Sequence, residues 1–268
     1  MHRFYLPPAQ RPADALLLTG REAHHALHVL RLRVGETVLV LDGAGNEYRC
    51  AVQHCGRDEV ALELLEHRSF PPLPYRVTLL QALPKGKLIE SIIQKATELG
   101  VARIVPLLTD RVVARLDSPG TAHKVEKWQL TAIEAIKQCG SPWLPQIEPS
   151  LTPRQFLERH EPFDLPLVAS LAPGSPHPRE YFRAFAAKHG HAPASVCVWV
   201  GPEGDLTPAE LELIQASGAR PISLGPLVLR ADTAALYCLS ILNYELSSAL
   251  NPAGTPASDH RTPMQSGR

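Results

Sequence analysis

The chain of 268 residues lacks a surplus of charge of either sign, because 27 basic residues balance 27 acidic ones. It therefore has no overall field that would attract nucleic acid or a membrane surface, and any such partner must meet a local patch. Long hydrophobic runs are missing too, since no stretch approaches the roughly 18 apolar residues that span a bilayer. Near the start we find no hydrophobic segment typical of a signal peptide. We expect a soluble, cytoplasmic protein without a membrane partner.

Cysteine is scarce, and no two cysteines have the C-x-x-C spacing of metal or redox motifs. The five cysteines are Cys50, Cys55, Cys139, Cys197 and Cys238. Their odd number argues against a disulfide framework, so we expect reduced thiols, partly buried in apolar segments. His24 and His28 could share one face of a helix. Two ligands without a carboxylate to complete the set do not indicate zinc, and we assign no metal.

The first part of the chain alternates apolar and polar residues with the period of half-buried strands. The expected strands are residues 36–41, 47–52 and 59–65. Asp42-Gly-Ala-Gly-Asn46 separates the first two as the loop of a hairpin. The segment from Gly20 to Leu30 is instead typical of a helix. We predict a small β-rich domain over residues 1–70.

A proline-rich connector follows, because three prolines between Ser69 and Pro74 interrupt the alternation and favour extended backbone. We take residues 71–75 as the linker. Beyond it, strand-like segments alternate with helix-like ones, which indicates a parallel sheet covered by helices over residues 76–250. The expected strands are 77–83, 101–107, 165–170, 196–200 and 221–224, and the expected helices are 88–99, 124–138 and 233–250. Residues 251–268 are rich in Pro, Ser, Thr and Gly and predict a disordered tail.

Glycine-bearing loops follow three of these expected strands. Gly201-Pro-Glu-Gly204 lies between a buried strand and Thr207-Pro-Ala-Glu210, which is a capping box that starts a helix. The segments 223–234 and 83–87 repeat the order of strand, loop and helix. Because ligands bind at the carboxyl ends of the strands in open α/β sheets, the three loops could meet around one ligand.

The chemistry of such a site would rest on backbone N–H and C=O groups at close range. These groups suit a ligand with an adenine edge and ribose hydroxyls. The sequence has neither a G-x-G-x-x-G fingerprint at the start of a helix nor a G-x-x-x-x-G-K-[ST] motif, which excludes the usual dinucleotide and P-loop sites. Each loop taken alone could also be only a tight turn.

Three separated motifs together resemble a known family. Gly201-Pro-Glu-Gly204, the segment Leu224-Gly-Pro-Leu-Val-Leu-Arg-Ala-Asp-Thr-Ala234, and Ile93-Gln-Lys-Ala-Thr-Glu-Leu-Gly-Val101 are similar to the knotted SPOUT-class methyltransferases. Within that class the chain most resembles the family that methylates N3 of a uridine in small-subunit ribosomal RNA. The likeness covers about residues 3–248. Arg3-Phe-Tyr-Leu6 and Val29-Leu-Arg31 match the N-terminal RNA-binding domain of that family, which is similar to a PUA barrel.

This resemblance implies the fold, the cofactor and the assembly. The expected fold is an α/β SPOUT-type parallel sheet with a C-terminal trefoil knot, preceded by a small PUA-like β-barrel domain. The expected cofactor is S-adenosylmethionine, and the expected partners are small-subunit ribosomal RNA and a second copy of the chain. The residues implied as cofactor contacts are Leu83, Gly201, Glu203, Gly204, Leu224, Gly225, Leu229, Thr233 and Ala234.

Methylation of uridine N3 requires that its proton be removed or shared, since the nitrogen lone pair is tied up in the imide. Asp232 could accept the proton or orient a water that does so. Arg230 could stabilise the developing negative charge or hold a phosphate. Asp232 could instead cap a helix that begins at Thr233, and Arg230 could be a solvated charge. Much of the acceleration can come from alignment of the reacting atoms alone.

Basic side chains that could contact RNA phosphates occur in both domains. They are Arg3, Arg31 and Arg33 in the smaller domain and Lys85, Lys87, Arg111, Arg115 and Lys124 in the larger one. Of these we select Arg3, Arg31, Lys85 and Arg111 as the RNA-binding candidates. Any one of them could equally be a solvated surface charge.

Several positions depart from the pattern of the family, and one of them is the missing basic residue after Gln138. Asp205 stands where a glycine usually follows Gly-Pro-Glu-Gly, Leu227 where an arginine is usual, and Asp232 where a glutamate is usual. Asp accepts left-handed backbone angles better than most residues, which makes Asp205 tolerable. The departures leave two alternatives open. One is a catalytically silent RNA-binding assembly factor, and the other is a knotted methyltransferase with a different RNA target, such as a ribose 2′-hydroxyl.

Overall fold

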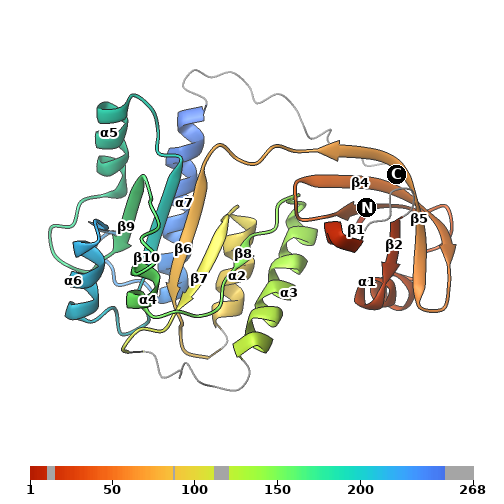
Figure 1. Cartoon of the computed structure of the whole chain (residues 1–268), viewed down its shortest axis with the longest axis horizontal. Coiled ribbons are helices and arrows are strands. Elements are labelled where there is room, and N and C mark those ends of the chain that lie inside the picture. Colours follow the sequence, from red (N-terminus) through yellow and green to blue (C-terminus); the bar gives the residue numbers. More distant parts are fainter. Residues whose placement is uncertain (11–15, 87, 112–120, 251–268) are drawn as a thin grey trace.

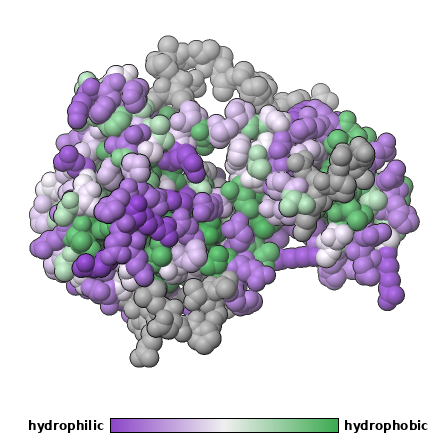
Figure 2. All heavy atoms as spheres, in the orientation of Figure 1, coloured by the Kyte–Doolittle hydropathy of each residue, from purple (hydrophilic) through white to green (hydrophobic). Residues whose placement is uncertain are grey.

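The computed structural model describes residues 1–10, 16–86, 88–111 and 121–250. They form two sheets side by side along the long axis of the molecule, with the N-terminal strands at one end and the helix-covered strands at the other (Figure 1). The first sheet ends with Ser69 and the second begins with Arg76. The predicted tail, residues 251–268, lies outside the described residues. Polar and apolar residues are interspersed on the visible face of both lobes (Figure 2).

The first sheet has the strand order β1-β3-β4-β5-β2. Its strands are β1 (His2–Tyr5), β2 (Leu16–Thr19), β3 (Thr37–Leu41), β4 (Asn46–Cys55) and β5 (Glu59–Ser69). β1 pairs with β3 in parallel, and the other pairings are antiparallel. The three predicted strands are confirmed, and inward-facing residues such as Val38 and Val60 are fully buried, whereas Leu64 and Leu65 are exposed. β1 and β2 were not predicted.

The helical segment predicted from residue 20 to 30 is also present, in two parts. α1 (Gly20–His24) continues into a wider turn over His25–Val29, where the Leu30 N–H donates to the His25 carbonyl. Ala23 and Ala26 of this segment are completely buried in the first core. A short 3₁₀ turn, Pro8–Gln10, follows β1.

The second sheet is parallel throughout, in the order β11-β9-β10-β6-β7-β8. Its strands are β6 (Arg76–Ala82), β7 (Arg103–Leu107), β8 (Gln146–Ile147), β9 (Leu165–Ala169), β10 (Ser195–Val200) and β11 (Arg220–Ile222). β6 and β10 lie in the middle with nearly every residue buried, as a strand covered on both faces requires. All five predicted strands are confirmed, and only the two-residue β8 was missed.

Helices cover both faces of this sheet (Figure 1). They are α2 (Leu88–Glu98), α3 (Thr121–Cys139), α4 (Pro153–Leu157), α5 (Pro178–His189), α6 (Pro208–Ala216) and α7 (Ala231–Leu250). Leu79 of β6 packs in the core shared with α2, α3, α5 and α7, whereas its neighbour Leu80 packs in the core shared with α4 and α6. Trp199 of β10 is buried in the second of these cores and lies edge-on to Phe156 of α4, with 5.3 Å between ring centroids.

The end of the chain crosses back to the middle of the sheet. After β11 at the sheet edge, α7 packs against α2, β6 and β10. α7 begins two residues before the predicted start of the helix and continues to Leu250. The trefoil knot implied by the family stays a prediction.

Two sets of contacts join the lobes. In the hairpin loop between β3 and β4, the Gly45 N–H donates to the Pro142 carbonyl at 2.9 Å, and the Leu144 N–H donates to the Gly43 carbonyl at 3.0 Å. Gly43 has a φ of 72°, and a Cβ there would lie 2.8 Å from the Leu144 Cβ. The predicted turn glycines therefore also allow this close approach.

The second set surrounds the end of α3, which lies beside β1 (Figure 1). Lys137 is buried at this junction, and its Nζ contacts Glu22 Oε1 of the first domain at 2.9 Å and Glu134 Oε1 at 3.0 Å. The Arg3 guanidinium donates to the carbonyls of Lys137 and Gln138 at 3.2 and 3.1 Å. A cation at the carboxyl end of a helix satisfies free carbonyls and opposes the helix dipole.

Candidate active site

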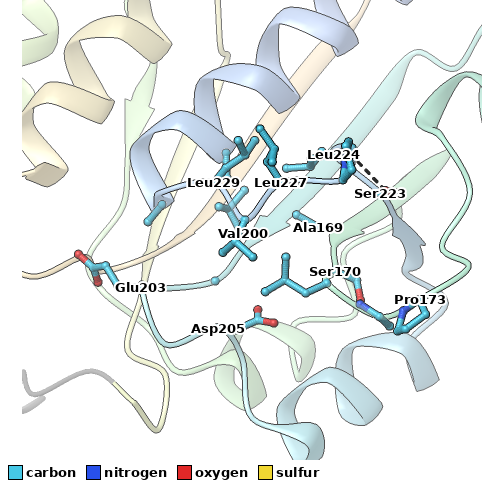
Figure 3. A pocket seen from close by; sticks show the side chains of 18 of the residues that line it. Ala169, Ser170, Pro173, Val200, Glu203, Asp205, Ser223, Leu224, Leu227 and Leu229 are labelled. Carbon is cyan, nitrogen blue, oxygen red and sulfur yellow. Dashed lines mark hydrogen bonds between the residues drawn. The ribbon is translucent and has the colours of Figure 1, made fainter.

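A pocket of about 270 Å³ opens at the carboxyl ends of β9, β10 and β11 (Figure 3). Three loops and the start of α7 line it. The lining residues are Ala169 to Gly174, Val200 to Glu203, Asp205, Ser223 to Leu229, Ala231 and Ala234. The sheet edge is the one predicted from the strand order, and two of the three predicted glycine-bearing loops contribute to the pocket.

The loop after β10 is a tight turn that needs glycine at its first position. A Cβ on Gly201 would lie 3.0 Å from Asp205 Oδ1 and 3.1 Å from the Leu206 nitrogen. Asp205 has a φ of 61°, as its place in the family's glycine position predicted. The turn closes through the Asp205 N–H, which donates to the Pro202 carbonyl at 2.9 Å.

The helix after this turn starts as predicted. Thr207 caps α6, and both hydrogen bonds of the capping box with Glu210 are present. Glu210 is buried, and its Oε1 also accepts the Asp110 N–H at 2.9 Å from the loop after β7. The capping residue therefore joins two loops of the sheet edge.

The loop after β11 forms the opposite wall. Gly225 has a φ of 105°, and its N–H donates to Ser223 Oγ at 3.3 Å. Leu224 and Leu229 are half-buried against the main core, whereas Leu227 and Val228 are 72% and 78% exposed. The loop thus offers backbone groups and apolar side chains to the pocket.

The third wall, residues 169–174, was missed by the sequence analysis. The Ser170 N–H donates to the Ile222 carbonyl at 3.0 Å, which fixes this loop beside β11. Ser170 Oγ accepts the Ala172 N–H at 3.1 Å. The available signal was the same order of strand, proline and glycine, since Pro173 and Gly174 follow β9 closely.

The structure places six of the nine predicted cofactor contacts on the pocket wall. They are Gly201, Glu203, Leu224, Gly225, Leu229 and Ala234. Leu83, Gly204 and Thr233 are not among its lining residues: Leu83 packs against the main core, and Thr233 is exposed on α7. The Glu203 carboxylate points away from the pocket centre in Figure 3, because it accepts the Lys85 N–H at 3.0 Å.

The catalytic candidates lie at the start of α7. Because α7 begins at Ala231, Asp232 is inside the first turn, and its alternative interpretation as the cap of a helix beginning at Thr233 is wrong. Asp232 Oδ1 is buried and finds no hydrogen-bond partner among the described residues. Arg230 is exposed, and its carbonyl accepts the Ala234 N–H at 2.8 Å.

Two more buried polar atoms at this sheet edge are unpaired within the described part of the chain. Gln81 Oε1 lies near the end of β6, and Thr109 Oγ1 lies just after β7. Buried polar atoms in native proteins nearly always have a hydrogen-bond partner. We therefore expect each of these atoms to bind a water molecule or a ligand. Together with Asp232 Oδ1 they mark the carboxyl edge beside the pocket as a polar region.

The four RNA-binding candidates occupy different surroundings. Arg3 contacts the end of α3 within the chain, as described above. The Arg111 guanidinium donates to the Gly204 carbonyl and, at 3.5 Å, to the Asp205 carbonyl. Lys85 and Arg31 have exposed side chains. The further basic candidates Lys87 and Arg115 lie outside the described residues.

Two other kinds of feature, a metal site and a membrane-spanning helix, are absent from the residues that the structure describes. No group of three or more His, Cys, Asp and Glu side chains there could hold a metal ion. His24 and His28 face each other with ring centroids 4.8 Å apart. None of the helices in the described ranges is both long and apolar enough to cross a membrane.

Comparison with known proteins identifies the two domains. Residues 71–243 match the family model of an RNA methyltransferase domain, and residues 18–65 match that of an RNA methyltransferase PUA domain. Solved structures of methyltransferases are similar to this chain over most of its length. A protein from Legionella pneumophila with the bound cofactor SAM is 31% identical with a TM-score of 0.80, and the match covers 90% of this chain and 96% of that one. Ribosomal RNA small subunit methyltransferase E from Neisseria gonorrhoeae, bound to S-adenosyl methionine, is 26% identical with a TM-score of 0.78, covering 91% and 97%.

Two curated relatives carry the same name as this Neisseria enzyme. Ribosomal RNA small subunit methyltransferase E of Synechocystis is 35% identical, covering 92% of this chain and 78% of the relative. The enzyme of the same name from Bacillus subtilis is 32% identical, covering 91% and 97%. The resemblance drawn from three motifs and the predicted α/β fold with a PUA domain are confirmed. The chain belongs to the ribosomal RNA small subunit methyltransferase E family.

Proposed function

We propose that this chain transfers the methyl group of S-adenosylmethionine to N3 of a uridine in the 16S RNA of the small ribosomal subunit, in the cytoplasm. The observation that carries the proposal is the pocket itself. Two glycine-bearing loops, 201–205 and 223–229, meet at the carboxyl edge of a parallel sheet in a chain that belongs to this family. Relatives with the same fold bind SAM.

The residues around the pocket suit that cofactor. The absence of a Cβ at Gly201 lets the loop close on itself, and Gly225 turns where few other residues could. Leu224 and Leu229 supply apolar surface for an adenine ring, and backbone groups of both loops supply hydrogen bonds. When bound, the cofactor supplies a methyl group on a sulfonium, which is ready for attack by a nucleophile.

In this reaction the chain itself binds the uracil base and accepts the proton of its N3 atom. Each unit by which a pKa exceeds the ambient pH costs about 1.4 kcal/mol when the proton must leave. In the proposal Asp232 accepts the N3 proton, directly or through a water. Support comes from its buried and unpaired Oδ1 beside the pocket residues Ala231 and Ala234. Gln81 and Thr109 add unpaired polar atoms to the same edge.

Arg230 has a different role in the proposal. Its guanidinium stands exposed at the entrance of α7, where it can hold a phosphate or the negative charge that develops on the uracil oxygen. Alignment of N3 with the methyl group contributes the larger part of the rate, since correct placement removes the entropy cost of a bimolecular encounter.

For the RNA we propose a path that includes the exposed Lys85 and the exposed Arg31 on the PUA domain. Arg111 contributes from the loop next to Gly204. We assign Arg3 no phosphate contact, because its guanidinium is used at the end of α3. The fixed contacts between the lobes would hold both basic regions in one orientation.

We further infer a homodimer with its interface near the pocket, as expected for the family. Leu227 and Val228 are strongly exposed on the pocket wall, and Tyr237 and Tyr244 are exposed on α7, seven residues apart. Apolar surface of this kind is typical of an interaction site. Light scattering after gel filtration tests the inference, and a monomer at micromolar concentration would contradict it.

The proposed activity is tested by incubating purified small subunits that lack this methylation with the protein and labelled S-adenosylmethionine. Digestion of the RNA to nucleosides and mass spectrometry should then show 3-methyluridine. A ribose-methylated nucleoside would instead support the other kind of knotted methyltransferase. No incorporation would support the silent assembly factor.

A further inference from the structure

Asp205 places a carboxylate on the wall of the pocket. Its φ of 61° lies in the left-handed region, which residues with a side chain seldom adopt. The residue lines the pocket together with Val200 and Ser170. Figure 3 shows its carboxylate below Val200, on the side of the loop that faces the loop after β9. The chain therefore keeps a strained backbone and adds a charge to the site.

The orientation of this carboxylate is fixed by its own turn. Asp205 Oδ1 accepts the Leu206 N–H at 2.8 Å and lies 3.0 Å from the position that a Cβ on Gly201 would take. One oxygen is thus used in the loop. The second oxygen, Oδ2, forms no hydrogen bond with the described residues. It is therefore available to a molecule in the pocket.

The pocket has an unbalanced charge. Among the residues that the structure describes, its lining includes two carboxylates, Glu203 and Asp205, and no Lys, Arg or His. Glu203 directs its carboxylate to the Lys85 N–H and away from the pocket centre. Arg111 contacts the carbonyls of Gly204 and Asp205 but is not a lining residue. Asp205 is therefore the charged side chain that acts most directly on a molecule in the pocket.

The two forms of the cofactor differ by one charge. Transfer of the methyl group breaks the bond between sulfur and methyl carbon, and the electron pair of that bond stays on sulfur. The positive sulfonium of S-adenosylmethionine becomes the neutral thioether of S-adenosylhomocysteine. A fixed negative charge in a partly enclosed site stabilises the first and has no comparable effect on the second.

We propose that Asp205 makes the pocket select the charged methyl donor over its neutral product. This inference rests on the proposed use of S-adenosylmethionine. Asp205 lowers the free energy of the bound donor by its negative charge, and it thereby favours exchange of spent product for fresh donor. Its function is to set specificity, and it forms no bond to the reacting atoms.

A purely structural role makes a different prediction. If Asp205 only closed the turn by accepting the Leu206 N–H, asparagine would replace it without effect, because the amide oxygen accepts the same hydrogen bond and Asn tolerates left-handed angles. Glycine would relieve the backbone strain but remove this hydrogen bond, so any loss of affinity would be the same for the donor and the product. The two substitutions thus separate the charge from the geometry of the turn.

The test is isothermal titration of the full chain with S-adenosylmethionine and with S-adenosylhomocysteine, in the absence of RNA. We expect Asp205→Asn and Asp205→Gly to weaken donor binding about fivefold to tenfold and to leave product binding within about twofold. Glu203→Gln is the matched control, and it should change both affinities by the same factor. Raising the salt concentration should reduce the preference of the unchanged protein more than that of Asp205→Asn.

The outcomes separate this inference from the function on which it rests. If the unchanged protein binds both ligands and Asp205→Asn keeps the same ratio of affinities, the selection by Asp205 is wrong while the proposed function stands. If the unchanged protein binds neither ligand, the proposed function fails and the inference fails with it. The midpoint of thermal unfolding of each variant shows that it is folded, and Asp205→Gly provides a variant without backbone strain.

Discussion

The Lys85 N–H donates a hydrogen bond of 3.0 Å to the Glu203 carboxylate, so the loop after β6 is tied to the loop after β10. Arg111 ties the loop after β7 to the same place through the Gly204 carbonyl. Two side chains that the sequence suggested as ligand contacts therefore hold neighbouring loops together. The shape of the pocket depends on these ties, because the backbone of residues 201–205 forms one of its walls.

Removal of the Glu203 carboxylate should loosen this wall. We expect Glu203→Ala to weaken binding of S-adenosylmethionine about threefold to tenfold, since an exposed hydrogen bond to a charged group contributes about 1 kcal/mol. Titration calorimetry measures the affinity. Glu203→Gln keeps an acceptor for the Lys85 N–H and should lose less. Equal losses for the two variants would show that the hydrogen bond does not matter.

Glu210 should contribute more to stability than an ordinary capping residue. It is buried, and its two oxygens accept the N–H groups of Thr207 and Asp110 at 2.8 and 2.9 Å. Glu210→Ala leaves both donors unpaired and should lower the free energy of unfolding by about 2–3 kcal/mol. Denaturant titration measures the change.

A second capping box supplies the control for this prediction. Thr152 and Gln155 form the same pair of bonds at the start of α4, where Gln155 is exposed. Gln155→Ala should lower the free energy of unfolding by only about 0.5–1 kcal/mol. Similar losses at both sites would show that the link from Glu210 to the loop after β7 adds nothing.

The buried ion pair between the lobes should matter for both stability and RNA binding. Lys137→Met leaves the Glu22 carboxylate, which is only 15% exposed, without its partner. The free energy of unfolding should fall by about 3 kcal/mol, and RNA affinity should fall while cofactor affinity is kept. Lys127→Met removes an exposed pair with Glu90 and should cost less than about 1 kcal/mol. Equal costs would contradict the assigned role of Lys137.

The thiols should divide into two classes. Burial raises the pKa of Cys50, Cys197 and Cys238 to about 12, so these groups stay protonated, and therefore unreactive, at any pH below about 11. Cys55 and Cys139 are only half-buried. Alkylation of the folded protein at pH 8 should modify these two, and unfolding should expose all five. Rapid modification of Cys197 in the folded protein would contradict the prediction.

The sequence predicted those elements whose signals are local. The period-two strands of the first domain and the alternating strands and helices of the second could be found because each buries a regular set of side chains. Both β1 and β2 were missed, since each has only four residues and its partners lie far along the chain. The helix α5 was missed although Pro178 starts it and Gly190 ends it, because it buries few residues, Pro178 and Phe182.

The site shows the same division. Glycines at 201 and 225 predicted the two main loops, since close approach and positive φ leave a mark on the sequence. The direction in which a side chain points leaves no comparable mark on the sequence. Glu203 appeared as a cofactor ligand and Arg3 as a phosphate contact, yet each is engaged by a backbone group more than 100 residues away. Such pairings follow from the folded topology alone.

Asp232 should be essential for the rate of methyl transfer and dispensable for cofactor binding. Asp232→Asn preserves the shape of the side chain and removes its ability to accept a proton, so the rate of a single turnover should fall at least about a hundredfold. The affinity for S-adenosylmethionine should stay within about twofold, because Asp232 does not line the pocket. The exposed Glu212 on α6 gives a control, and Glu212→Gln should react at the normal rate. A rate for Asp232→Asn within about threefold of normal would contradict this role. The rate would then depend on alignment of the reacting atoms, or another group such as Thr109 with a bound water would accept the N3 proton.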